Sequence, residues 1–247
     1  MALPKRELPT YQKTMPVSGD IIKYRPHTVK EEQILNMAIM SGETDDLLNA
    51  VVQIVENCTY SDVSGLFPAE VEYLYMLIKA CSDTPIIPVK YSVDPDIDYT
   101  TGEDKHKDCG GEISSNFNIN EDVYININDD MYDYGTKTED GCWLIKLEDE
   151  ISIKIKINGT FTTTDDDTLY KLTECIIDEK EDTVSYKGVD YSKDDFNDWV
   201  NESPSTLFKN FETFMNLSPE TQAELKFKCK CGKVFTEVET GVLRFLV

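Results

Sequence analysis

The stretch that decides the fold of the C-terminal part is Leu225-Lys-Phe-Lys-Cys-Lys-Cys-Gly-Lys-Val-Phe-Thr-Glu-Val-Glu239. Apolar and polar residues alternate on both sides of its centre, which is the period of a half-buried strand. Gly232 lies between the two alternating runs and permits a tight reversal of the chain. We therefore predict a β-hairpin over 225–240 that carries two thiols at its turn, the shape of one half of a zinc knuckle.

A second stretch supplies a matching half. His106-Lys-Asp-Cys-Gly-Gly111 carries an imidazole and a thiol separated by two residues, and an alternating run follows it over 113–119. The four donors would form a tetrahedral Cys₃His set, which is the closed donor set of a structural zinc ion. They are His106, Cys109, Cys229 and Cys231. The alternative interpretation is a pair of unrelated hairpins with reduced cysteines and a surface histidine.

The composition describes an acidic chain with enough apolar residues to fold. Its 247 residues suffice for one large or two small domains, and 40% hydrophobic residues exclude wholesale disorder. The chain has 47 acidic and 24 basic residues, a net charge of −23. Because affinity for nucleic acid depends largely on basic side chains, we expect no nucleic-acid binding and partners that are basic proteins. Mimicry of DNA is the alternative that the same charge raises.

The cysteines and the N-terminal sequence indicate a reducing compartment. Seven cysteines are an odd number without the tight, even spacing of a secreted disulfide scaffold. The opening Met-Ala-Leu-Pro-Lys-Arg6 is not a signal peptide, and no run approaches 18 apolar residues. We therefore expect a cytosolic, reduced protein with no membrane partner.

The first third of the chain shows a hairpin and then helices. Residues 1–27 form an N-terminal unit with a β-hairpin over 10–25. Residues 28–82 are predicted to form three helices, of which the first starts at a capping box of Thr28 and Glu31 and the third starts at Pro68. Residues 83–111, rich in proline and charge, are predicted to be a loop or insertion.

Residues 112–247 are predicted to form one compact α+β region that ends in the C-x-C hairpin, so the fold class is α+β. Strands are expected over 113–120, 123–128, 142–147 and 151–157, and the loop 129–140 is expected to contribute nothing to the core. Helices are expected after Thr164, extending to Ile176, and after Ser192 and Pro204.

Enzyme motifs are missing from the sequence. It contains no glycine-rich phosphate loop, no G-x-S-x-G and no H-E-x-x-H. His27 directly precedes a helix cap and is interpreted as a boundary residue, and a Cys₃His zinc site has no open position for a substrate. We therefore expect no catalytic residue, no small-molecule substrate and no cofactor beyond one structural zinc ion. A zinc-dependent enzyme is the less favoured alternative.

Four stretches together resemble the baseplate hub proteins of T-even-like contractile-tailed bacteriophages. They are Ile22-Lys-Tyr-Arg-Pro-His-Thr-Val-Lys-Glu-Glu-Gln-Ile-Leu35, Pro68-Ala-Glu-Val-Glu-Tyr-Leu-Tyr-Met-Leu-Ile-Lys-Ala80, the helices around Trp199 and Phe211–Asn216, and Leu225-Lys-Phe-Lys-Cys-Lys-Cys-Gly232 with the ending Gly241-Val-Leu-Arg-Phe-Leu246. Members of that family tend to carry C-x-x-C at both knuckle positions, where this chain has His106-x-x-Cys109 and Cys229-x-Cys231.

The resemblance implies a role without enzymatic activity. A protein of this kind takes part in building the central hub of the tail baseplate, as a hub subunit or assembly factor. Its partners would be other baseplate hub proteins. It would be found in the host cytoplasm during assembly and in the tail baseplate of the virion.

Overall fold

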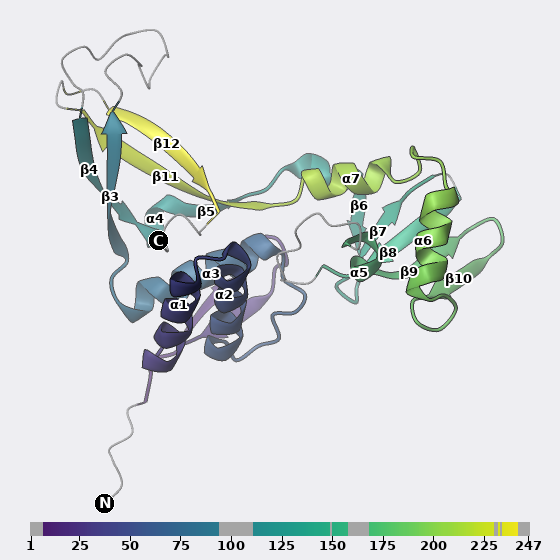
Figure 1. Cartoon of the computed structure of the whole chain (residues 1–247), viewed down its shortest axis with the longest axis horizontal. Coiled ribbons are helices and arrows are strands. Elements are labelled where there is room, and N and C mark those ends of the chain that lie inside the picture. The colour runs from purple at the N-terminus through teal and green to yellow at the C-terminus, as the bar shows by residue number, and fades with distance from the viewer. Residues whose placement is uncertain are drawn as a thin grey trace, which may run out of the picture.

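The computed structural model of the chain describes residues 7–93, 111–148, 150–157, 168–229, 232 and 234–241. The molecule is elongated and has two lobes, each with its own hydrophobic core (Figure 1). Helices and antiparallel sheets occur in both lobes, which confirms the predicted α+β class.

The first lobe packs β-hairpins around a central helix. Its elements are β1 (Tyr11–Thr14), β2 (Ile21–Tyr24), α1 (Val29–Ser41), α2 (Thr44–Cys58), α3 (Pro68–Ser82), β3 (Ile86–Val93), β4 (Gly111–Asn118), α4 (Ile119–Asp122), β5 (Val123–Asn126), β11 (Glu220–Lys228) and β12 (Val234–Thr240). Every residue of α3 from Ala69 to Ile78 is buried, as expected for a helix covered on all sides. Thr221 of β11 donates its hydroxyl to the Ala69 carbonyl at 2.7 Å, which ties the sheet β12-β11-β5 to α3.

A strand occupies part of the segment 83–111, for which the sequence predicts a loop or insertion. Residues 86–93 form β3, which pairs with β4 from Ile86↔Asn118 to Val93↔Gly111. Pro88 cannot donate to a ladder, but in the described residues β3 pairs on one side only, so the proline is tolerated. Residues 94–110 lie outside the described part.

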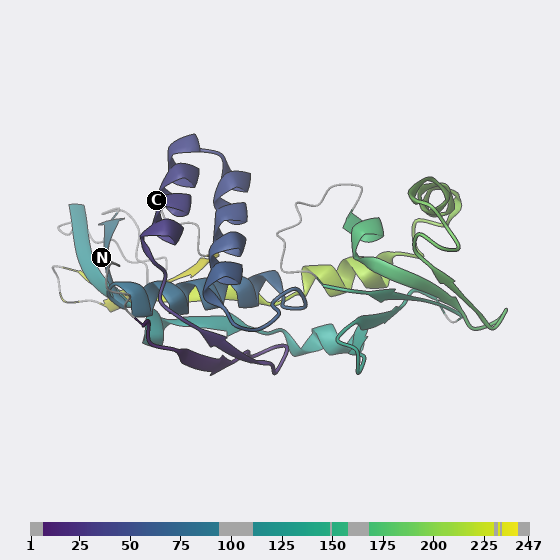
Figure 2. The same cartoon turned by 90° about the horizontal axis from the view of Figure 1, so that it is seen from below.

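The second lobe is a five-stranded antiparallel sheet with helices on one face (Figure 2). Its elements are the 3₁₀ helix η1 (Asp129–Asp133), β6 (Gly135–Lys137), β7 (Trp143–Lys146), β8 (Ile151–Ile155), α5 (Thr168–Leu172), β9 (Thr173–Asp178), β10 (Thr183–Tyr186), α6 (Lys193–Glu202) and α7 (Lys209–Asn216). The strand order is β10-β9-β8-β7-β6. Trp143, Ile153 and Ile155 of the sheet pack with Phe211 and Phe214 of α7 in its core.

Two predictions for this lobe are wrong. The helix expected to extend to Ile176 ends at Leu172, and Cys175 and Ile176 lie in β9, because pairing with β8 and β10 overrides the local helical pattern. The loop 129–140 does contribute to the core, since it contains η1 and β6, and the Met131 side chain is fully buried.

The second lobe is inserted into the sheet of the first lobe. Strands β5 and β11 pair with each other, from Val123↔Ala223 to Asn126↔Glu220. The chain leaves the first lobe after β5 and returns to it at β11, with the second lobe in between (Figure 1). Residues 112–247, expected to form one compact body, are thus divided between two cores.

An aromatic contact joins the lobes. Phe67, just before α3, lies edge-on to Trp143 with ring centroids 5.6 Å apart, and Trp143 contacts Phe214 at 5.2 Å. Lys137 Nζ donates to the Ser18 carbonyl at 2.8 Å. The core of the second lobe therefore includes two buried residues of the first, Val17 and Phe67.

Gly135 of β6 is expected to tolerate no side chain. A Cβ built on it would lie 2.5 Å from Cε2 of Phe214 and 3.3 Å from Cε3 of Trp143, which is closer than packed carbon atoms approach. We expect Gly135→Ala to lower the free energy of unfolding by about 1–3 kcal/mol, measured by urea unfolding. In the Phe214→Leu background the same change should cost less, and an equal cost in both backgrounds would contradict the steric explanation.

Candidate functional site

A buried carboxylate fastens the N-terminal hairpin to α3. Glu70, in the first turn of α3, is fully buried, and its Oε1 accepts hydrogen bonds from Val17 N at 2.9 Å, Ser18 N at 2.8 Å and Ser18 Oγ at 3.1 Å. Its Oε2 accepts from Phe67 N at 3.2 Å. A carboxylate at a helix N-terminus is also stabilised by the helix dipole. The connection between β1 and β2 is therefore held against the helix that forms the centre of the lobe.

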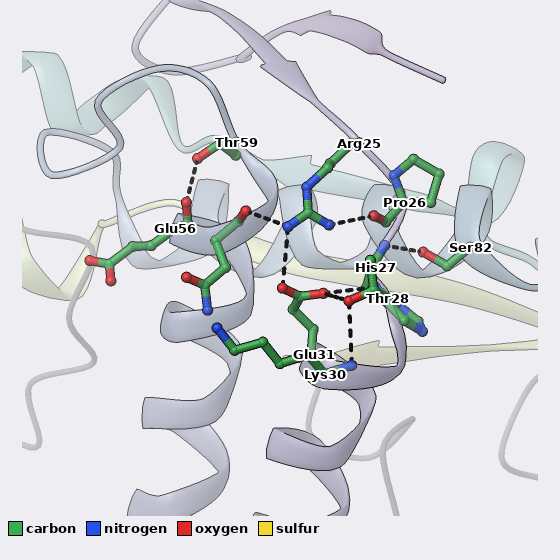
Figure 3. A network of polar contacts seen from close by, with 10 residues as sticks. Arg25, Pro26, His27, Thr28, Lys30, Glu31, Glu56, Thr59 and Ser82 are labelled. Atoms are coloured by element: carbon green, nitrogen blue, oxygen red, sulfur yellow. Dashed lines mark hydrogen bonds and ion pairs between the residues drawn. The ribbon is translucent and has the colours of Figure 1, made fainter. Parts of the chain in front are cut away.

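A second buried carboxylate lies where β2 leads into α1 (Figure 3). Glu31 Oε2 accepts from Thr28 N at 2.7 Å and from Thr28 Oγ1 at 2.5 Å, which confirms the predicted capping box. Glu31 Oε1 accepts from Arg25 Nη2 at 3.2 Å, and the same nitrogen donates to the Asn57 carbonyl at the end of α2 at 2.8 Å. One guanidinium thus joins the start of α1 to the end of α2.

His27 connects the start of α1 to α3 as well. The backbone N–H of His27 donates to Ser82 Oγ at 2.8 Å (Figure 3). Burial disfavours the charged imidazole and lowers the pKa of His27. His27 lies between the end of β2 and the start of α1, as interpreted from the sequence.

The stability contributed by Glu31 is expected to depend on pH. Burial by itself would raise the pKa of this carboxyl, but the hydrogen bonds from Thr28 and Arg25 outweigh it and lower the pKa from 4.5 to about 2. A lowered folded-state pKa stabilises the fold above the unfolded-state pKa, and that contribution is lost as the pH falls from 4.5 to about 2. We expect Glu31→Gln to lower the free energy of unfolding by about 1–3 kcal/mol near neutral pH and to have little effect near pH 2.

Urea unfolding at a series of pH values measures this effect. Glu32→Gln, at the exposed neighbouring position, is the control and should change the stability by less than about 0.5 kcal/mol. A Glu31→Gln protein with the same pH dependence as the unmodified protein would contradict the assignment.

Of the four predicted zinc ligands, the structure describes Cys229 only. Its thiol is buried directly after β11, and Gly232 N donates to the Cys229 carbonyl at 2.8 Å. Gly232 has a φ of 91°, as predicted for a tight reversal at this turn. His106, Cys109 and Cys231 lie outside the described residues.

The described flanks of the two thiol-bearing stretches lie at the same end of the first lobe. Ser115 Oγ of β4 donates to the Lys226 carbonyl of β11 at 2.5 Å, so these strands lie side by side. The β3–β4 and β11–β12 pairs reach the same end of the lobe (Figure 1). Gly111, two residues after Cys109, and Cys229 are therefore both located there. In the described ranges, no group of three or more His, Cys, Asp and Glu side chains is arranged to hold a metal ion.

The described surface of the protein has two notable hollows. The larger, of about 650 Å³, lies on the second lobe and is lined by Lys146, Leu147, Glu148, Glu150, Ile151 and Asn210. The smaller, of about 390 Å³, lies between the lobes, and Asp20 and Ser64 of the first lobe and Lys137 and Asp140 of the second contribute to it. Asp140 is paired with Lys154, and Lys137 binds the Ser18 carbonyl, so both groups serve contacts within the protein.

Comparison with known proteins decides the family. A family model described as T4 bacteriophage base plate protein matches residues 8–247. The chain belongs to this family. The baseplate protein is thus a structural component of a phage tail, as the sequence resemblance implies. No curated protein and no solved structure matches the chain. Among the described residues of this baseplate protein, no helix is both long and apolar enough to cross a membrane.

A protein that works as a part of a larger assembly needs surfaces for its neighbours, and exposed apolar side chains are the usual mark of such surfaces. Both lobes of the baseplate protein carry them. The most exposed are Met40 at 85% on α1 and Val189 at 82% after β10. Sequence periodicity alone does not identify these positions, because it shows which face of an element is apolar but not whether another element covers it.

Proposed function

We propose that this baseplate protein takes part in the assembly of the central hub of the baseplate, as a hub subunit or assembly factor, and that it acts through protein–protein contacts without enzymatic activity. The match of the family model to residues 8–247 is the observation that carries this proposal. The buried carboxylates Glu31 and Glu70 support it, because both fix the positions of secondary-structure elements and so give partners a pre-organised surface.

The charge of the chain supports basic hub proteins as partners. A net charge of −23 attracts positively charged surfaces and accelerates encounter with them. The proposed place of action is the host cytoplasm while the baseplate is being built.

Mixing experiments test the proposal. The purified protein is combined in turn with each of the other baseplate proteins of the same phage, and native mass spectrometry measures the products. We expect a complex of fixed stoichiometry with at least one hub protein. Persistence of the free protein in every mixture would overturn the proposal, and a complex with a host DNA-binding protein that duplex DNA displaces would favour mimicry of DNA instead.

The zinc site remains a separate proposal. We propose that His106, Cys109, Cys229 and Cys231 bind one structural zinc ion, which would hold the β3–β4 and β11–β12 hairpins together. It is supported by the Ser115–Lys226 hydrogen bond between the two hairpins and by the burial of the Cys229 thiol at the end where both arrive.

Metal analysis of the purified protein is expected to give about one zinc ion per chain. Cys229→Ser should reduce that content and the thermal stability together, because it removes one of the four donors. Cys142→Ser, which changes a buried thiol of the second lobe, is the matched control and should keep the zinc. Protein that contains no zinc after purification without chelators would end this proposal.

A further inference from the structure

The helical hairpin of α1 and α2, residues 29–58, projects from the first lobe as a finger (Figure 2). Three large apolar side chains of α1 are exposed on it: Val29 at 68%, Met37 at 65% and Met40 at 85%. At 3.6 residues per turn they fall within an arc of roughly 80°, so they form one stripe along the helix. We call Val29, Met37 and Met40 the finger stripe.

The finger stripe is not the surface that joins α1 to α2. That contact is made by Ala38 of α1 with Leu47 and Ala50 of α2, and half-buried Ile34, Leu35 and Ile39 pack against them. The finger already has its own small core, so the stripe adds nothing to the folding of the hairpin. Methionine side chains are flexible and polarisable and are used at surfaces that bind partner helices.

The base of the finger is fixed. Arg25 links Glu31 at the start of α1 to the Asn57 carbonyl at the end of α2, and His27 N–H binds Ser82 of α3 (Figure 3). Because these contacts join three helices, and those of Glu31 and His27 are partly buried, the finger is held in one orientation. A partner that binds the stripe does not have to order it first.

The net charge of the finger selects the partner. Residues 29–58 contain six acidic residues and one basic residue, Lys30. Glu31 is buried and paired with Arg25, and the other five acidic side chains are exposed: Glu32, Glu43, Asp45, Asp46 and Glu56. Two copies of this finger would repel each other, and a basic segment would be attracted.

We propose that the finger is the docking site for an amphipathic segment of another baseplate protein, whose apolar side chains cover Val29, Met37 and Met40 and whose lysine and arginine side chains lie against the exposed acids. This inference rests on the proposed function and adds the surface and the chemistry of its partner. Burial of the stripe supplies the affinity, and the exposed acidic side chains of the finger supply orientation and rate of encounter.

The test uses the full chain and each other baseplate protein of the same phage as a purified probe, with affinity measured by biolayer interferometry. Met37→Gln together with Met40→Gln should weaken binding to the partner roughly tenfold or more, because the anchors of an interface are lost. Raising the salt from about 0.05 M to about 0.5 M should weaken binding of the unmodified protein, as should Glu43→Lys. Circular dichroism checks that each variant is folded.

Val189→Gln is the matched control, because it removes an equally exposed apolar side chain from the second lobe and should leave the affinity unchanged. If the double methionine variant binds the partner with unchanged affinity, the inference is overturned and the proposed function stands. Self-association through the finger, shown by a cross-link from a photoreactive residue at position 40 to a second copy, would also overturn it. The absence of any complex with the unmodified protein overturns the proposed function itself.

Discussion

Replacement of Glu70 by alanine is expected to destabilise the protein by about 3–5 kcal/mol, because it leaves buried donors without an acceptor. The backbone N–H groups of Val17, Ser18 and Phe67 all donate to this carboxylate in the unmodified protein. Water has no ready access to the N–H groups of Val17 and Phe67, whose bonds to Glu70 are buried, whereas the Ser18 N–H is half-buried. Urea unfolding followed by circular dichroism measures the change.

Two variants make this prediction specific. Glu70→Gln keeps one oxygen acceptor of nearly the same shape, so its cost should lie between that of the alanine variant and zero. Glu212→Ala removes a first-turn acid of α7 that is exposed, and it should change the stability by less than about 0.5 kcal/mol. If Glu70→Ala and Glu212→Ala have equal effects, the hydrogen bonds to Glu70 contribute no net stability.

Trp143→Ala is expected to lower the free energy of unfolding by about 3–5 kcal/mol, because it removes a large side chain from a packed core. The indole is 2% exposed and contacts the rings of Phe67, Tyr132 and Phe214 at centroid distances of 5.6, 5.9 and 5.2 Å. Its removal leaves a cavity at the one place where the core of the second lobe meets Phe67 of the first. Urea unfolding followed by circular dichroism measures it.

The second tryptophan of the chain provides the control. Trp199 of α6 is half-buried, and its ring is tilted against that of Phe196 and edge-on to that of Phe208. Trp199→Ala should therefore cost about 1–3 kcal/mol, less than Trp143→Ala. If Trp199→Ala destabilised the protein more than Trp143→Ala, the contact between the lobes would add little to stability.

Elements with local signals were predicted well from the sequence. The capping box of Thr28 and Glu31 fixes the start of α1, and Ser192, whose hydroxyl binds the Asp195 N–H at 3.2 Å, fixes the start of α6. The C-terminal hairpin follows from strict alternation, and β11 and β12 pair in register from Gln222↔Thr240 to Lys228↔Val234. Caps and alternation depend on neighbours in the chain, so they can be read without the rest of the fold.

Elements that depend on distant partners could not be predicted in this way. Ile176 fits a helical pattern, and it lies in a strand because Ile153 of β8 and Ser185 of β10 pair with it. Glu70 has the sequence signature of an ordinary first-turn acid, and only the approach of Val17 and Ser18, more than fifty residues away, gives it three of its four donors. Whether the finger stripe is covered likewise depends on the packing of the whole lobe.

The pairing of Asn126 with Glu220 has a consequence for how this family can diversify. An inserted body whose entrance and exit are adjacent in space can be exchanged, shortened or enlarged between these two residues, and the host sheet still closes behind it. Any body that replaces the second lobe must cover Val17 and Phe67, the two buried side chains of the first lobe that belong to the core of the second.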